Sequence, residues 1–227
     1  MPDPTRVEST LPRRLTEGPR RGLYKRFFAW LLARLQDNYG DEIERRKRRL
    51  LADLSGTVLE IGAGAGANLA LYPAGVELLL VEPNAHMHPY LREVAARHHL
   101  SFELRAGTAE HMDVPDGCAD WVVATLVLCS VDDPEAALRE VLRVLKPGGR
   151  LIFIEHVAAP RGTRLRRWQK RLRVVWRAIG DGCTIDRETW VSIQAAGFER
   201  CEIEHFAADN LAIVRPHIAG VAFKRDV

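Results

Sequence analysis

The sequence predicts an α/β fold with a seven-stranded, mostly parallel sheet, a reversed C-terminal strand, helices on both faces and N-terminal cap helices. From residue 57 onward, short apolar segments alternate with helical segments, which requires a parallel sheet covered on both faces. Near the C-terminus, apolar segments at 200–206 and 217–223 follow one another without a helix, so they should pair as an antiparallel hairpin.

The helices before the sheet are predicted from residue spacing. Residues 23–35 carry apolar side chains at a helical period, and residues 41–54 begin with acids and continue with arginines, as a helix dipole favours. Both helices should lie over the mouth of a site at the carboxyl ends of the strands. Strands are then predicted at 57–61, 76–81, 101–105, 120–125 and 150–156, and helices at 66–71, 84–98, 133–145, 164–178 and 187–196.

Length and composition fit one domain with an extension. The chain has 227 residues with 47% hydrophobic content, which is ample for a core. Residues 1–21 hold prolines and arginines and few apolar side chains, and they are predicted to be a disordered basic N-terminus. Residues 22–55 form the predicted cap helices, and residues 56–227 form the α/β domain.

Charge and cysteine content limit the function classes. The net charge of +3 is small, but residues 161–177 hold eight basic side chains and no acid. A solvated helix face and a surface for anionic lipid or an anionic substrate are both open explanations. No nucleic-acid recognition motif accompanies these arginines. The four cysteines lack the spacing of a zinc site or a disulfide framework, which indicates reduced thiols in a cytoplasmic protein, with weak peripheral membrane contact as an open alternative.

The most informative segment is a glycine-rich loop directly after the first predicted strand. Glycines at positions 62, 64 and 66 allow positive φ angles and leave no Cβ between the backbone and a ligand. A helix predicted to start at residue 66 would offer unpaired N–H groups to an anion. Glu82 ends the next predicted strand, close to the spacing at which an acid accepts ribose hydroxyls. These residues indicate a site for a nucleoside cofactor.

Glu60 distinguishes between nucleoside cofactors. Gly62, Gly64 and Ala67 fit a dinucleotide fingerprint only loosely. A carboxylate two residues before the first glycine would repel a pyrophosphate, whereas it would attract a cationic amino-acid tail. With Glu82 and a Lys-Pro-Gly-Gly segment predicted as a turn at 146–149, the pattern resembles the Rossmann-like class I S-adenosylmethionine-dependent methyltransferases.

Further segments resemble one subgroup of that class. They are Glu82-Pro83-Asn84, Glu155-His156-Val157, Gly180-Asp181-Gly182-Cys183, Arg187-Glu188-Thr189-Trp190 and Pro216-His217-Ile218. These are similar to methyltransferase-like enzymes that S-methylate small alkyl thiols. The resemblance covers about residues 56–224 and implies S-adenosyl-L-methionine as cofactor and a small, fairly apolar thiol as substrate.

The resemblance and the strand ends together give a set of candidate site residues. Many relatives have an Asp where this chain has Thr108, so the adenine contact is expected at Ala109 or Glu110. His156, with Asp181 acting on it, is predicted to accept the proton of the thiol. The predicted cofactor-binding residues are Glu60, Gly62, Gly64, Gly66, Asn68, Glu82, Pro83, Ala109, Glu110 and Leu126, and no metal ligand is predicted.

Other chemistries remain as alternatives. Residues 125–128 lack the polar amide and prolines of amino-group methyltransferases, and Cys129 is not preceded by proline as in cytosine-5 enzymes. A buried Cys is usually a small hydrophobe. C- or O-methylation of a quinone, phenol or lipid-like acceptor stays the main alternative, because a fold does not determine a substrate. A nicotinamide-dependent oxidoreductase and a non-catalytic cofactor-binding protein are weaker alternatives.

Overall fold

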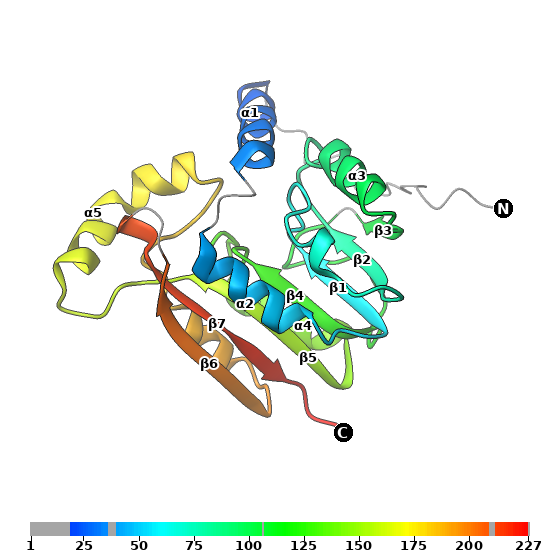
Figure 1. Cartoon of the computed structure of the whole chain (residues 1–227). Helices are drawn as coiled ribbons and strands as arrows, with labels where there is room; N and C mark the ends of the chain where they lie inside the picture. The colour runs from blue at the N-terminus through cyan, green and yellow to red at the C-terminus, as the bar shows by residue number, and fades with distance from the viewer. Residues whose placement is uncertain (1–18, 36–39, 106, 209–211, 227) are drawn as a thin grey trace.

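A computed structural model describes residues 19–35, 40–105, 107–208 and 212–226 (Figure 1). Its seven-stranded sheet has the order β3-β2-β1-β4-β5-β7-β6. The predicted disordered segment falls almost wholly on residues outside the described ones, and the predicted domain division stays a prediction. The strands are β1 (Thr57–Ile61), β2 (Glu77–Val81), β3 (Phe102–Arg105), β4 (Ala119–Thr125), β5 (Leu145–His156), β6 (Arg200–Ala207) and β7 (Pro216–Phe223).

The strand directions confirm the predicted topology. β1 pairs in parallel with β2 and β4, and β2 with β3 and β4 with β5 do the same. β7 runs antiparallel to both β5 and β6, so it is the reversed strand of the predicted hairpin. Strand order reverses between β1 and β4, and in such sheets ligands bind outside the carboxyl ends at that point.

Helices cover both faces of the sheet because successive strand residues point to opposite sides. Val58, Leu78 and Leu80 face a core that includes side chains of α2 and α3. Leu59 and Ile61 face the opposite core, with side chains of α4 and α6. The helices are α1 (Pro19–Leu35), α2 (Asp41–Leu51), α3 (His88–Arg97), α4 (Pro134–Val144), α5 (Arg164–Ile179) and α6 (Thr189–Ala195), with short 3-10 turns η3 (Leu69–Leu71) and η4 (Ala212–Val214).

The first two helices have different positions. α2 lies across the sheet and buries Ile43, Lys47 and Leu51, which recur every fourth residue on one side of the helix. Arg46 joins α2 to β6 through an ion pair of 2.5 Å with Glu204. α1 stands beyond the ends of the strands, beside α5 (Figure 1). Both predicted helices are therefore present, but only α1 is positioned to cover a site, so the expectation that both lie over its mouth is wrong for α2, which packs on the face of the sheet.

Two predicted local structures differ from the observed ones. No α-helix follows the glycine loop: the predicted helix at 66–71 is a series of turns that ends in η3. Gly66 has φ +95°, and Pro73 disfavours helical backbone at Tyr72, so only a few residues are free to be helical. The second difference is at 146–149, where the predicted turn is an irregularity within β5: Ala119 pairs with Leu145, but the next pair joins Trp121 to Arg150.

Candidate functional site

A cavity of about 550 Å³ opens at the carboxyl ends of β1, β2, β4 and β5, where the strand order predicts a ligand site. Side chains of α1, including Phe28 and Leu32, and the loop after α5 complete its wall. All but one of the predicted site residues line this cavity: Glu60, Gly62, Gly64, Asn68, Glu82, Pro83, Ala109, Glu110, Leu126, His156 and Asp181.

The glycine loop approaches the cavity through Gly62 and Gly64. Gly62 has φ +61°, and a Cβ there would lie 2.6 Å from Cγ2 of Val127, so only glycine fits. Gly66 is the predicted residue that does not line the cavity. Its Cα faces the core beside α3, where a Cβ would meet Leu69 at 3.0 Å. The need for glycine at position 66 therefore comes from packing and from its φ of +95°, and the predicted cofactor contact is not supported there.

The carboxylate of Glu82 connects β2 to the glycine loop. One oxygen accepts a hydrogen bond of 2.8 Å from the N–H of Gly64, and the other accepts one of 2.7 Å from the N–H of Asn84. Burial raises the pKa of Glu82, although these two hydrogen bonds act against the shift. Each carboxylate oxygen has a second lone pair, so Glu82 can still accept hydrogen bonds from ligand hydroxyls at the cavity wall.

Glu60 is the centre of a buried polar group on the same wall. Its oxygens accept hydrogen bonds of 2.8 Å from Nδ2 of Asn68 and from the hydroxyl of Tyr72. The charge of Lys47, on α2, also acts on it, while burial raises the pKa of Glu60 to about 7. Oδ1 of Asn68 is buried without a hydrogen-bond partner among the described residues. This arrangement offers a carboxylate, an ammonium and an amide oxygen to one ligand.

Lys47 and Tyr72 were not predicted as site residues. Lys47 is 1% exposed and lines the cavity, and burial lowers its pKa. A basic run such as residues 45–49 normally predicts solvent exposure. The available signal was spacing, because Lys47 lies four residues from both Ile43 and Leu51 on the buried side of α2.

The loop after β4 is held by Glu155 of the neighbouring strand. The fully buried carboxylate accepts hydrogen bonds from the N–H groups of Val127, Leu128 and Cys129 at 2.9, 2.9 and 3.1 Å. Leu126, just before them, has φ +58°, an uncommon conformation for a side chain with a Cβ. Strained backbone is held here at the cavity wall, where Leu126 was predicted to contact the cofactor.

The predicted adenine residues lie on the wall near α4. Ala109 is buried, and Glu110 uses its carboxylate to accept hydrogen bonds from the N–H groups of Asp132 and Asp133 at 2.9 and 3.4 Å. Glu110 therefore braces the segment that leads into α4. A contact between Glu110 and adenine stays a prediction.

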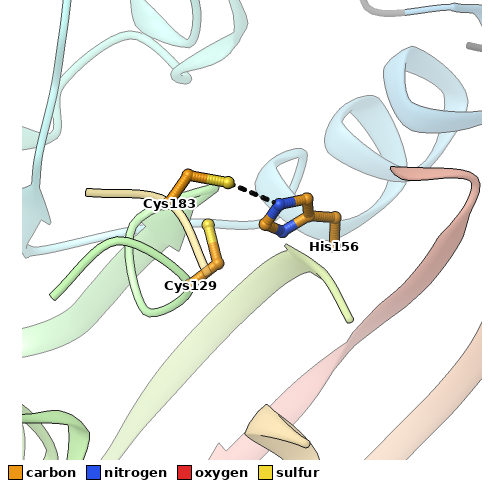
Figure 2. Close-up of side chains that lie close together, drawn as sticks. All are labelled: Cys129, His156 and Cys183. Carbon is orange, nitrogen blue, oxygen red and sulfur yellow. Dashed lines mark hydrogen bonds between the residues drawn. The ribbon is translucent and has the colours of Figure 1, made fainter. Parts of the chain in front are cut away.

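Two cysteines and a histidine gather at the other end of the cavity. Nε2 of His156 lies 2.8 Å from Sγ of Cys183, and Nε1 of Trp176 donates a hydrogen bond of 3.0 Å to the same sulfur. Sγ of Cys129 is the third member, and the two thiols and the imidazole ring point toward one another (Figure 2). Sequence patterns predict only a packing role for Cys129, and Cys183 lies too far along the chain for its spacing to indicate a cluster.

Each member of the cluster changes the ionisation of the others. Burial raises the pKa of Cys129, but hydrogen bonding to Cys183 and the charge of His156 outweigh it, so the pKa falls. Burial lowers the pKa of His156, and the charge of Cys129 outweighs that effect and raises it. The hydrogen bond to the Cys129 sulfur and burial both raise the pKa of Cys183. Within the cluster, Cys129 therefore ionises more readily than an ordinary thiol, and His156 is a stronger base than an ordinary imidazole.

Asp181 lines the cavity in a left-handed backbone conformation, with φ +48°. Its N–H donates a hydrogen bond of 3.1 Å to the hydroxyl of Tyr24 on α1. Nε2 of His156 faces Cys183, and Nδ1 has no hydrogen-bond partner in the part of the chain that the structure describes. Asp181 therefore does not orient His156 through Nδ1, and the predicted cooperation of these two residues has no hydrogen bond to support it.

Comparison with known proteins assigns the chain to a family. A family model for a methyltransferase domain matches residues 59–153. Thiol S-methyltransferase TMT1A of Homo sapiens is 40% identical over 88% of this chain and 87% of its own length. Thiol S-methyltransferase TMT1B of Rattus norvegicus is 41% identical over the same shares. The chain belongs to the thiol S-methyltransferase family.

Solved structures support the fold of this family member at lower identity. The YcgJ protein of Bacillus subtilis has a TM-score of 0.64 and 18% identity, covering 81% of this chain and 100% of its own. A SAM-dependent methyltransferase from Thermotoga maritima has a TM-score of 0.59 and 23% identity, covering 93% of this chain and 97% of its own. The predicted class is confirmed: the protein is an S-adenosylmethionine-dependent methyltransferase of class I.

The residues of this methyltransferase fit its methyl donor. S-adenosylmethionine carries ribose hydroxyls, an ammonium and a carboxylate. The cavity wall carries groups of the matching kinds: Glu82 can accept from hydroxyls, Glu60 can pair with an ammonium and Lys47 with a carboxylate, and these contacts stay predictions. The unpartnered Oδ1 of Asn68 is a further buried acceptor for the ammonium. The glycine loop leaves room for close approach at Gly62 and Gly64.

Proposed function

We propose that this methyltransferase transfers a methyl group to a small, fairly apolar thiol. The observation that carries the proposal is the similarity over most of both chains to proteins named thiol S-methyltransferase, at 38–41% identity. The cavity is compatible with such an acceptor, because Trp176 and Val214 contribute apolar or aromatic wall and pack with Cys129 and Cys183.

Cofactor binding follows from the two acids at the strand ends. Glu82 accepts hydrogen bonds from the ribose hydroxyls while its other lone pairs hold Gly64 and Asn84. Glu60 binds the ammonium and Lys47 the carboxylate of the amino-acid end. Leu126 and Pro83 also line the cavity, and Ala109 and Glu110 are the residues expected on the adenine side.

The end of the cavity that carries the two cysteines and His156 must hold an ionised thiol in line with the methyl group. S-adenosylmethionine supplies an activated methyl group on a sulfonium, so the main contribution of the protein is alignment of the nucleophile. A thiol ionises near pH 8.5, so a modest shift gives substantial thiolate at neutral pH. His156 is the proposed proton acceptor because it lies at this end of the cavity, next to Cys183. Asp181 is proposed to border the acceptor.

A methyl-transfer assay with a panel of acceptors tests the function. Alkyl thiols, phenols and quinols are supplied at equal concentration, and methylated products are identified by mass spectrometry. We expect methyl thioethers from alkyl thiols, with S-adenosylhomocysteine formed in equal amount. Turnover of a phenol or quinol without any thiol product would overturn the thiol assignment and favour O- or C-methylation. Binding of S-adenosylhomocysteine without any product would favour a non-catalytic role.

We also propose weak contact with an anionic membrane surface. None of the helices among residues 19–35, 40–105, 107–208 and 212–226 combines the length and hydropathy that crossing a bilayer needs. α5 exposes both arginines and apolar side chains, among them Trp168 at 54% and Val174 at 75%. α1 exposes Phe27 at 57% and Trp30 at 42%, and it contacts α5 through the hydrogen bond from Tyr24 to Ile179.

Sedimentation with vesicles separates this surface from a merely solvated helix. We expect binding to vesicles of anionic lipid that weakens with salt, and little binding to vesicles of zwitterionic lipid. Trp168→Ala should reduce binding, with Trp190→Ala, on α6, as the control. Recovery of the protein with neither vesicle type would indicate a solvated face, and equal recovery with both would show that the lipid charge does not drive the contact. The cytoplasmic location remains a prediction that rests on four free cysteines.

A further inference from the structure

Cys129, His156 and Cys183 come from three separate segments at one end of the cavity. Cys129 follows β4, His156 ends β5, and Cys183 lies after α5. One ligand-type atom from each of the three lies within 4.8 Å of the other two (Figure 2). Their exposed fractions are 2%, 5% and 9%, yet all three line the cavity. A ligand that bound all three would therefore face the methyl acceptor.

The donor set selects a class of ligand. Two thiols and one imidazole are soft and borderline donors that suit zinc better than magnesium or calcium. Tetrahedral zinc with usual bond lengths would place neighbouring ligand atoms about 3.6–3.8 Å apart. The observed limit of 4.8 Å and the His156–Cys183 distance of 2.8 Å bracket these values, so small side-chain movements suffice. Three protein ligands leave a fourth position open, as in catalytic zinc sites.

A second observation also points to a ligand. Nδ1 of His156 is buried with no hydrogen-bond partner among the described residues, which is costly for a polar atom in the interior. Of the two ring nitrogens of His156, only Nε2 has a hydrogen-bond partner, the sulfur of Cys183. A metal bound to Nδ1, after the ring has turned to present this nitrogen to the two sulfurs, would supply the partner that Nδ1 now lacks.

Outer contacts hold the two sulfurs in position. Trp176 donates its indole N–H to Sγ of Cys183 at 3.0 Å, and the hydroxyl of Ser130 lies 3.5 Å from Sγ of Cys129. The backbone N–H of Cys129 is fixed by Glu155. Hydrogen bonds of this kind orient ligands and stabilise metal-bound thiolates.

We propose that Cys129, His156 and Cys183 bind a zinc ion whose fourth ligand is the sulfur of the methyl acceptor. The proposal rests on the proposed thiol S-methylation and changes the role of one residue, because His156 would bind zinc instead of accepting the proton. The acceptor thiol would lose its proton to solvent on binding, since a coordinated thiol is deprotonated outright. Its sulfur then forms the new bond to the methyl carbon, and the methyl–sulfonium bond breaks with its electron pair kept by S-adenosylhomocysteine. The neutral thioether leaves zinc.

Metal content and cobalt spectroscopy test the site in the full chain. Protein purified without chelator should hold about one zinc per chain by elemental analysis after dialysis against metal-free buffer. Replacement by Co²⁺ should give the absorption bands of tetrahedral thiolate coordination, and an added alkyl thiol should shift them. The variants Cys129→Ser and Cys183→Ser should lose the metal, whereas Cys201→Ser on β6 should keep it.

Titration with S-adenosylhomocysteine serves as the fold check for each variant, since the cofactor residues are separate from the cluster. Removal of zinc should lower thiol methylation at least tenfold, and added zinc should restore it. Full methylation by metal-free protein would overturn the zinc site and leave thiol S-methylation standing. Zinc retained equally by Cys183→Ser would show an adventitious ion only and would also overturn it. If no thiol changes the cobalt spectrum and no thiol is methylated, both the binding of the acceptor sulfur to the metal and the proposed thiol S-methylation would be overturned.

Discussion

The carboxylate of Glu82 and the backbone N–H of Gly64 are joined by a hydrogen bond of 2.8 Å, so the end of β2 fixes the loop that follows β1. This contact gives Glu82 two tasks. It shapes the glycine loop, and it faces the cavity where the ribose of the methyl donor is expected. A loss of Glu82 therefore removes both a ligand contact and the support of the loop.

Glu82→Ala should weaken binding of S-adenosylhomocysteine by about 1.5–3 kcal/mol, the usual scale for lost hydrogen bonds to a charged acceptor. Isothermal titration measures the change. Glu77→Ala is the matched control, because Glu77 lies at the exposed start of the same strand. Unchanged affinity in a folded Glu82→Ala protein would rule out the ribose assignment.

Gly62→Ala should destabilise the protein more than Gly117→Ala does. Both glycines have similar positive φ angles, +61° and +57°, so both variants suffer the same backbone strain. Only at position 62 does the new Cβ collide, 2.6 Å from Val127, whereas position 117 has nothing within 4 Å. We expect an extra loss of about 1–3 kcal/mol in the free energy of unfolding, measured by urea denaturation. Equal losses would mean that the loop yields to accommodate the methyl group.

Much of the fold could be predicted because local patterns decide it. Apolar strands placed between turns and amphipathic helices specify the sheet, and the lack of an α-helical sequence pattern between the last two strands specifies the reversed strand. The segment 66–71 was predicted wrongly because the five residues between Gly66 and Tyr72-Pro73 look helical by composition, while backbone restrictions at both ends prevent a helix.

The place of a side chain at the cavity was predictable where it follows from position in the sheet, as for Glu60, Glu82 and His156 at strand ends, while their roles stay predictions. It was not predictable where side chains from distant segments converge. Cys183 meets His156 only because the loop after α5 folds over the cavity, and no local spacing records that. Lys47 was missed for a related reason, since its burial depends on α2 packing across the sheet.

Tyr24→Phe should impair acceptor binding more than cofactor binding. The Tyr24 hydroxyl donates to the carbonyl of Ile179 at 3.0 Å and accepts from the N–H of Asp181 at 3.1 Å, so it ties α1 to the loop that carries Cys183. Each lost hydrogen bond costs about 0.5–1.5 kcal/mol. We expect the KM for an alkyl thiol to rise several-fold with little change in S-adenosylhomocysteine affinity. Tyr90→Phe, on α3, is the control, and equal KM values would show that α1 does not position the loop.

The stability of the ligand-free protein should fall as pH rises through the ionisation of Glu60. Burial raises the pKa of Glu60 from 4.5 to about 7, although Tyr72, Asn68 and Lys47 oppose the shift and Glu82 adds to it. Below about pH 4.5 both folded and unfolded chains hold this proton, so Glu60 makes no difference to stability. Between these pKa values the folded state binds more protons than the unfolded state, so the free energy of unfolding decreases with pH. The full shift corresponds to about 3 kcal/mol.

Glu60→Gln separates this effect from those of Lys47 and Glu82, which remain in place. The amide cannot ionise, so its urea unfolding curves from about pH 5 to about pH 8 should lack the part of the decline that Glu60 causes. Glu77→Gln, which removes an exposed carboxyl, should keep the wild-type decline.

The charge of Glu60 should have the opposite effect on ligand binding, because ionised Glu60 attracts the ammonium of S-adenosylhomocysteine. Affinity of the wild type should therefore rise over this range and that of Glu60→Gln should not; parallel pH profiles in both proteins would show that Glu60 neither titrates there nor binds the ammonium.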